Sequence, residues 1–231
     1  MPVNRRACLA ILMAMPLFGC VSSPKQFAKT DVDRLADLHR HEANAGLVRL
    51  AEKLYRRNPR EWKKGGHASL DAALLQLSDL PRYAASAAAG GLRGTALLLA
   101  GLREDYPRDR VAAFVGGLGD MLNDAFNGKT EFFILDDLDA QKLHNAARNV
   151  EIAAWKLANA RRSQPEGDLP AGVPILFSNE MTPVQNLSFE REFGRLVGNL
   201  DMLSRIVADK TSRSVVKIAQ NLATAVFLPI K

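Results

Sequence analysis

The sequence predicts an all-α protein, a helical bundle or irregular stack of about seven helices with room for one short two-stranded β element. Two observations predict this class. Apolar residues recur at helical spacing through several long segments, and Ser, Thr and Asp stand where those segments begin. Proline and glycine fall between the segments, where they interrupt helices. We therefore expect a single helical domain over residues 30–231, allowing a subdivision near 127–136.

The first expected helix begins after Thr30 and ends near Asn58. Thr30 is followed three residues later by Asp33, the pattern of an N-cap with a reciprocal acid. Pro59 ends the helix, because the residue before a proline avoids the helical region of backbone angles. A shorter helix is expected over 70–77, capped by Ser69.

Two segments rich in small residues follow, at 84–102 and 111–126. A membrane span at 84–102 is disfavoured, because Arg93 at its centre costs about 2.5–3.5 kcal/mol and each leucine recovers only about 0.3–0.6 kcal/mol. We expect two buried helices instead. Gly116, Gly117 and Gly119 would let them pack against each other as a tight hairpin.

Three more helices are expected, over 140–162, 188–210 and 215–227. Residues 130–135 fit either a strand or the entry to a helix, and the apolar residues 173–177 would pair with 132–135 as the β element. The connection 163–187 contains four prolines. A structureless segment of that length inside a compact domain is often functional, and its role stays open.

The beginning of the chain has the features of a secretion signal. Arg5 and Arg6 precede an uncharged, mostly apolar run over residues 7–18. This run is shorter than the roughly 20 residues of a spanning helix. It fits the apolar region of a signal peptide, which is about 7–15 residues long.

The run ends in Leu17-Phe18-Gly19-Cys20, which resembles the lipobox of bacterial lipoproteins, although Phe18 is bulky for its position. The resemblance implies that residues 1–19 are a signal peptide removed between Gly19 and Cys20. It also implies that Cys20 carries diacylglycerol on its thiol and a further acyl chain, such as palmitate, on its new amino terminus.

Residues 20–29 would then form a lipidated tether that keeps the domain near the membrane, since nine extended residues reach about 30 Å at most. Val21 stands where an aspartate commonly retains such proteins in the inner membrane. In a Gram-negative source, this resemblance implies the periplasmic face of the outer membrane.

Net charge and cysteine positions limit the classes of partner and binding site that we expect. Lysine and arginine exceed the acids by six, and about four of these charges remain once Arg5 and Arg6 are removed. The basic residues are scattered, so we expect no nucleic-acid partner. Both cysteines, Cys8 and Cys20, lie at the front of the chain, which leaves the expected domain without a disulfide or a cysteine metal site. We expect no cofactor.

Chemical motifs are weak. Asp37, His39 and His41 share a helical segment and are the best metal or acid–base candidates, provided that a distant ligand such as Glu131 or His144 joins them. The alternative is an ordinary solvated helix face, and the tight His-Glu-x-x-His signature is missing.

Arg148, Asn149 and Glu151 lie among alanines in the helix expected over 140–162 and are candidates for a polar binding groove. The alternative is that these residues lie on the solvent-exposed face of the helix. Residues 128–130 lack the earlier glycine of a phosphate loop, and helix capping explains the acids at 136–139.

These observations favour a lipid-anchored envelope protein that acts as a non-catalytic interaction or assembly factor for an unknown envelope protein. One alternative is an envelope enzyme of the cell-wall hydrolase type, marked by His39, His41 or His144 converging with carboxylates in a cleft. The other is a carrier of lipid or another apolar ligand. It would have a large cavity walled by the glycine-rich helices and residues 173–177.

Overall fold

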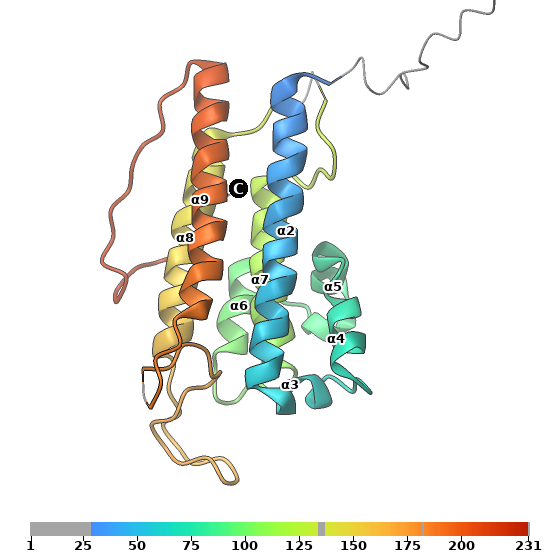
Figure 1. Cartoon of the computed structure of the whole chain (residues 1–231), viewed down its shortest axis with the longest axis vertical. Helices are drawn as coiled ribbons and strands as arrows, with labels where there is room; N and C mark the ends of the chain where they lie inside the picture. The colour runs from blue at the N-terminus through green and yellow to red at the C-terminus, as the bar shows by residue number, and fades with distance from the viewer. Residues whose placement is uncertain (1–28, 134–136, 182, 231) are drawn as a thin grey trace, which may run out of the picture.

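The structure is a computed structural model that describes residues 29–133, 137–181 and 183–230, and over these residues it has eight α-helices and no strand. The predicted all-α class is confirmed. Four long helices dominate the molecule (Figure 1). They are α2 (Asp31–Arg57), α7 (Arg110–Ala125), α8 (Ala140–Asn159) and α9 (Ser188–Thr211).

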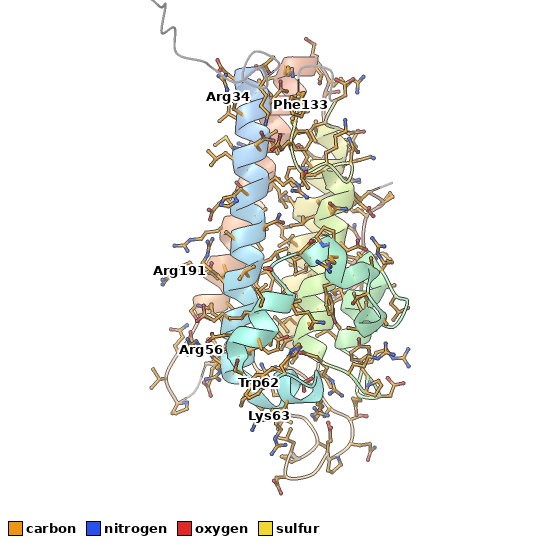
Figure 2. All side chains as sticks on the ribbon, turned by 90° about the vertical axis from the view of Figure 1, so that its right-hand side faces the viewer. Arg34, Arg56, Trp62, Lys63, Phe133 and Arg191 are labelled. Carbon is orange, nitrogen blue, oxygen red and sulfur yellow. The ribbon has the colours of Figure 1, made fainter. Side chains whose placement is uncertain are left out.

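These four helices form a closed ring, since α2 and α8 each contact both α7 and α9. Neighbours in the ring run in opposite directions (Figure 1). The apolar stripes meet in the centre, where the rings of Phe114 and Phe193 pack edge to face at 6.5 Å between centroids. Charged side chains such as Arg34, Arg56 and Arg191 point outward (Figure 2). The long helices thus bury the faces that their sequence periodicity predicts.

Four short helices and a 3₁₀ turn connect α2 to α7. They are α3 (Pro59–Lys64), α4 (Leu70–Gln76), α5 (Leu80–Ala85), the turn Ala87–Ala89, and α6 (Gly94–Gly101). Helices α4 and α5 lie to one side of α2 and α7, α3 follows the end of α2, and α6 packs along α7 (Figure 1). The prediction of one helix over 84–102 is therefore wrong. Gly90 and Gly91 adopt φ angles of +70° and +78°, which no right-handed helix accommodates.

The expected hairpin of glycine-rich helices does form between α6 and α7. A Cβ atom on Gly117 would lie 2.5 Å from the backbone nitrogen of Leu98 and 2.6 Å from the carbonyl oxygen of Gly94. Only glycine permits this approach, because real Cβ atoms do not come so close to backbone.

Capping signals mark the starts of α2 and α4 as predicted. The Asp33 backbone N–H donates to Thr30 Oγ1 at 3.2 Å, and the Thr30 N–H donates to the Asp33 carboxylate at 2.7 Å, which completes a capping box. The first helix ends at Arg57, with Asn58 as its C-cap. Ser69 caps α4 by accepting from the N–H of Ala72.

The predicted helix over 215–227 does not form. Ser212 adopts a left-handed φ of +51° and ends α9, and residues 213–230, named here the C-terminal segment, are non-helical. The segment passes along the outside of α8 and α9 and then turns back into the bundle (Figure 1). The physical reason is that side chains on α8 form hydrogen bonds with the backbone of this segment.

Residues 173–177 dock against the ends of two helices. The Ile175 N–H donates to the carbonyl of Ala160 at 3.0 Å, and Asn58 exchanges two hydrogen bonds with the backbone of Phe177. The described residues contain isolated bridges but no two-stranded element, so that part of the prediction is wrong there. Residues 134 and 135, half of the predicted partner, lie outside the described residues.

No helix among the described residues is both long and apolar enough to cross a membrane. The predicted signal peptide, its cleavage site at Gly19 and Cys20, and nearly all of the tether lie outside the described residues. Lipidation of Cys20 therefore stays a prediction.

Candidate functional site

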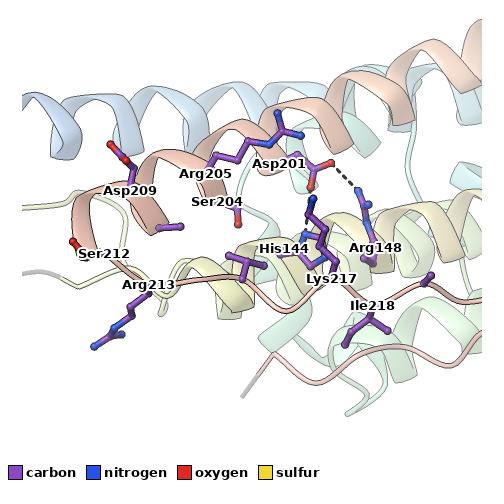
Figure 3. Close-up of a pocket in the computed structure, with 13 residues that line it drawn as sticks. His144, Arg148, Asp201, Ser204, Arg205, Asp209, Ser212, Arg213, Lys217 and Ile218 are labelled. Atoms are coloured by element: carbon purple, nitrogen blue, oxygen red, sulfur yellow. Dashed lines mark hydrogen bonds and ion pairs between the residues drawn. The ribbon is translucent and has the colours of Figure 1, made fainter.

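A half-open cavity of about 730 Å³ lies between α8, α9 and the C-terminal segment (Figure 3). Basic side chains from all three elements line it, together with a smaller number of acids and an apolar wall. The basic side chains, besides His144, are Arg148, Arg205, Arg213 and Lys217.

A cluster of charged groups joins α8 to α9 at the wall of this cavity. His144 and Arg148 lie four residues apart and so share one face of α8. The Arg148 guanidinium donates to the Asp201 carboxylate at 2.7 Å, and Nδ1 of His144 lies 3.7 Å from the other oxygen of Asp201. Arg148 also pairs with Glu151 at 3.2 Å.

The His144 side chain is held in an unfavourable environment for positive charge. Its residue is 9% exposed, and its Nε2 atom is enclosed without a hydrogen-bond partner among the described residues. Burial lowers the pKa of His144, as do the charges of Arg148 and Lys217, while Asp201 raises it in part. This environment therefore favours the neutral imidazole.

Side-chain amides on α8 hold the outer wall of the cavity in place. Gln141, Asn145 and Asn149 are spaced by four residues, so they line up along the helix. Gln141 exchanges two hydrogen bonds with the backbone of Val216, at 2.8 and 3.1 Å. Asn149 does the same with the backbone of Leu228, at 2.7 and 2.9 Å.

Asn145 adds a third anchor by donating to the carbonyl of Pro229 at 2.8 Å. Together the three amides satisfy backbone groups that a helix would otherwise pair internally. We name these three residues the amide ladder. It explains why an apolar sequence with helical spacing is extended here.

The three residues predicted as a groove do not line one groove. Arg148 lines the cavity, whereas Asn149 is fully buried and holds Leu228. Glu151 pairs with Arg148 but borders a separate, apolar hollow of about 380 Å³ beside Trp155. Sequence reasoning missed Asp201 and Lys217, and the four-residue spacing of the amides was the one signal available for the ladder.

The metal candidates are engaged elsewhere. His39 Nδ1 lies 2.6 Å from Oδ1 of Asn199, which ties α2 to α9. Asp37 pairs with Lys29 and accepts from the N–H of Phe132 at 2.8 Å, while His41 is exposed. No group of three His, Cys, Asp or Glu side chains within the described ranges could hold a metal ion.

A second buried polar cluster lies at the start of α7. The Tyr55 hydroxyl donates to the Asp109 carboxylate at 2.7 Å, and Asp109 caps α7 by accepting from the N–H of Ala112 at 2.9 Å. Burial raises the pKa of Asp109, partly offset by these hydrogen bonds. We interpret this cluster as structural, because Asp109 caps α7 and at the same time joins the start of α7 to α2 through Tyr55.

Comparison of this chain with protein-family models, curated proteins and solved structures finds no match.

Proposed function

We propose that this protein is a lipid-anchored, non-catalytic interaction or assembly factor of the cell envelope, and that the cavity between α8, α9 and the C-terminal segment is its binding site. The cavity carries the proposal: its volume of about 730 Å³ lies within the range of ligand pockets, about 300–1,000 Å³. The anchoring part rests on Arg5, Arg6 and the lipobox-like residues that end in Cys20.

An envelope hydrolase is the second candidate, because a histidine, a carboxylate and a serine border the same cavity. The distances favour binding over catalysis. His144 and Asp201 are 3.7 Å apart, beyond a good hydrogen bond, and the hydroxyl of Ser204 donates to the carbonyl of Ala140 at 2.7 Å. Ser204 is thus oriented toward α8 backbone rather than toward the imidazole.

A fluorophosphonate probe tests this second candidate. A covalent adduct that disappears in Ser204→Ala would establish the hydrolase and overturn the non-catalytic proposal. We expect no labelling above that of the Ser204→Ala control.

The carrier alternative has less support. Its expected walls were the glycine-rich helices and residues 173–177. Helices α6 and α7 instead pack directly on each other, and Ile175 docks against the end of α8.

The proposal is tested by crosslinking native membranes and purifying the tagged protein. The tag belongs in the exposed loop between Gly167 and Asp168, because the C-terminal segment is docked. Three variants are compared with the natural chain. Cys20→Ala removes the anchor, Ala219→Trp fills the cavity, and Ala223→Trp places the same bulk on an exposed position of the same segment outside the cavity.

We expect a defined set of envelope proteins that is lost with Cys20→Ala and Ala219→Trp but kept with Ala223→Trp. Partners that survive Ala219→Trp would place the interaction elsewhere on the surface. Absence of any partner would overturn the interaction function.

A further inference from the structure

The cavity walls carry more positive than negative charge. Its lining includes two acids, Asp201 and Asp209. The bases that line it are three arginines and one lysine, namely Arg148, Arg205, Arg213 and Lys217. Within the described residues, Arg205, Arg213 and Lys217 make no ion pair. An anion entering the cavity would therefore meet cations that are not already neutralised.

The charges converge at one place. Figure 3 shows Lys217 beside His144, and Arg148 joined to Asp201, whereas Arg205 and Arg213 point away from this group. Asp201 pairs with Arg148 at 2.7 Å and lies 3.7 Å from Nδ1 of His144, whereas Lys217 makes no ion pair with it. Burial is the largest cause of the lowered pKa of His144, and the charges of Arg148 and Lys217 lower it further.

Two polar atoms at this place have no partner. Nε2 of His144, on a residue that is nine-tenths buried, and Nε of Arg148 are both enclosed without a hydrogen bond among the described residues. Buried polar groups in folded proteins almost always have a partner, so such atoms call for an explanation. An anionic oxygen near His144 would favour its protonated form and supply the missing acceptor.

The arrangement of donors favours a tetrahedral anion. A carboxylate is well matched by the fork of a single arginine. Here the donors come from two elements, His144 and Arg148 on α8 and Lys217 on the C-terminal segment, which suits the several acceptor oxygens of a phosphate group. The lining also contains the apolar residues Ala208, Val215 and Ile218, and the volume far exceeds that of a phosphate alone.

We infer that this cavity binds the phosphate group of an amphipathic molecule, with the phosphate against His144, Arg148 and Lys217 and the apolar part against Val215 and Ile218. The inference rests on the proposed function, which assigns the cavity as the binding site. The phosphate comes either from a phospholipid headgroup or from a soluble phosphate ester.

Calorimetric titration of the purified full chain tests the ligand class. The probes are inorganic phosphate, hexyl phosphate, hexanoate, and a dihexanoyl phosphatidylglycerol kept below its micelle concentration. Hexyl phosphate and hexanoate have matched tails and differ in the anionic group. We expect hexyl phosphate to bind more tightly than both hexanoate and inorganic phosphate.

A matched pair of double variants locates the site. Arg205→Gln with Lys217→Gln removes two exposed charges from the cavity, and Arg191→Gln with Arg195→Gln removes two exposed charges from α9 outside it. We expect the first pair to weaken hexyl phosphate binding by about tenfold or more, and the second to leave it unchanged. Binding should also raise the pKa of His144, followed by NMR of its ring protons.

Hexanoate binding as tightly as hexyl phosphate, or equal effects of the two double variants, would overturn the inference. Tight binding of the phospholipid identifies a headgroup as the source, and binding of the soluble ester alone identifies a soluble one. If hexyl phosphate fails while Ala219→Trp still loses its partners, only the ligand class is wrong. If hexyl phosphate binds but no partner is found, the ligand class stands and the interaction function falls.

Discussion

Replacing Gly117 by alanine should destabilise this protein, although alanine is the better helix former. Gly117 lies on the face of α7 that meets α6. Its added Cβ would come within 2.5 Å of Leu98 N and 2.6 Å of Gly94 O. Both are backbone atoms, so no side-chain rotation relieves the clash and α6 itself must move.

The expected magnitude follows from two opposing contributions. Alanine gains about 1 kcal/mol of helix propensity over glycine. Overpacking a tight contact costs about 1–3 kcal/mol, and a backbone clash belongs at the upper end of that range. We therefore expect Gly117→Ala to lower the free energy of unfolding by about 1–2 kcal/mol.

Gly194→Ala on α9 is the matched control. Nothing lies within 4 Å of its added Cβ, so only the propensity gain applies. We expect it to raise the free energy of unfolding by about 0.5–1 kcal/mol. The same substitution in two helices of one protein should thus have opposite signs.

Urea unfolding followed by circular dichroism at the helix band measures both variants. The midpoint should fall for Gly117→Ala and rise for Gly194→Ala, with unchanged slopes. If Gly117→Ala is as stable as the natural protein, then α6 and α7 do not approach as closely as described, and the argument for the hairpin fails.

Three further predictions concern buried polar groups. Asn149→Ala removes both hydrogen bonds to the backbone of Leu228, so the free energy of unfolding should fall by about 1–3 kcal/mol. Amide hydrogen exchange should become faster over residues 225–230 but not in α2. The pKa of His144 in the folded protein lies below its ordinary value. Its contribution to the free energy of unfolding is therefore present above about pH 6.5 and is lost as the pH falls through the folded pKa. The loss amounts to about 1.4 kcal/mol for each unit by which the pKa is lowered. His144→Gln should flatten that decline between pH 7 and 5 in urea titrations, and an unchanged pH profile would contradict the assignment. Tyr55→Phe removes a hydrogen bond to buried Asp109 and should cost about 1–3 kcal/mol by thermal unfolding, whereas no loss would mean that the contact contributes nothing.

The long helices were predictable because their signals are local. The capping pair of Thr30 and Asp33, the stop at Pro59 and the apolar stripes act within a few residues of one another. The break at Gly90 and Gly91 was not predictable. Small apolar residues indicate burial, but they do not indicate whether a helix continues or ends. Only the observed φ angles at the two glycines reveal the turn.

The candidate site was predictable in small part. Arg148 was identified from its place among alanines, but Asp201 and Lys217 come from elements far along the chain and meet it only in the folded protein. The C-terminal segment has the periodicity of a helix. Backbone pairing with Asn149, about 79 residues earlier in the chain, overrides that preference, and no local pattern announces it.

The amide ladder also determines the order in which parts of the structure form. A chain synthesised from its amino terminus completes α8 long before residues 213–230 emerge. Until they do, Gln141, Asn145 and Asn149 lack their backbone partners and face water. The cavity therefore acquires its outer wall last, so the newly made protein passes through a stage in which the four long helices have been synthesised and the cavity has not formed.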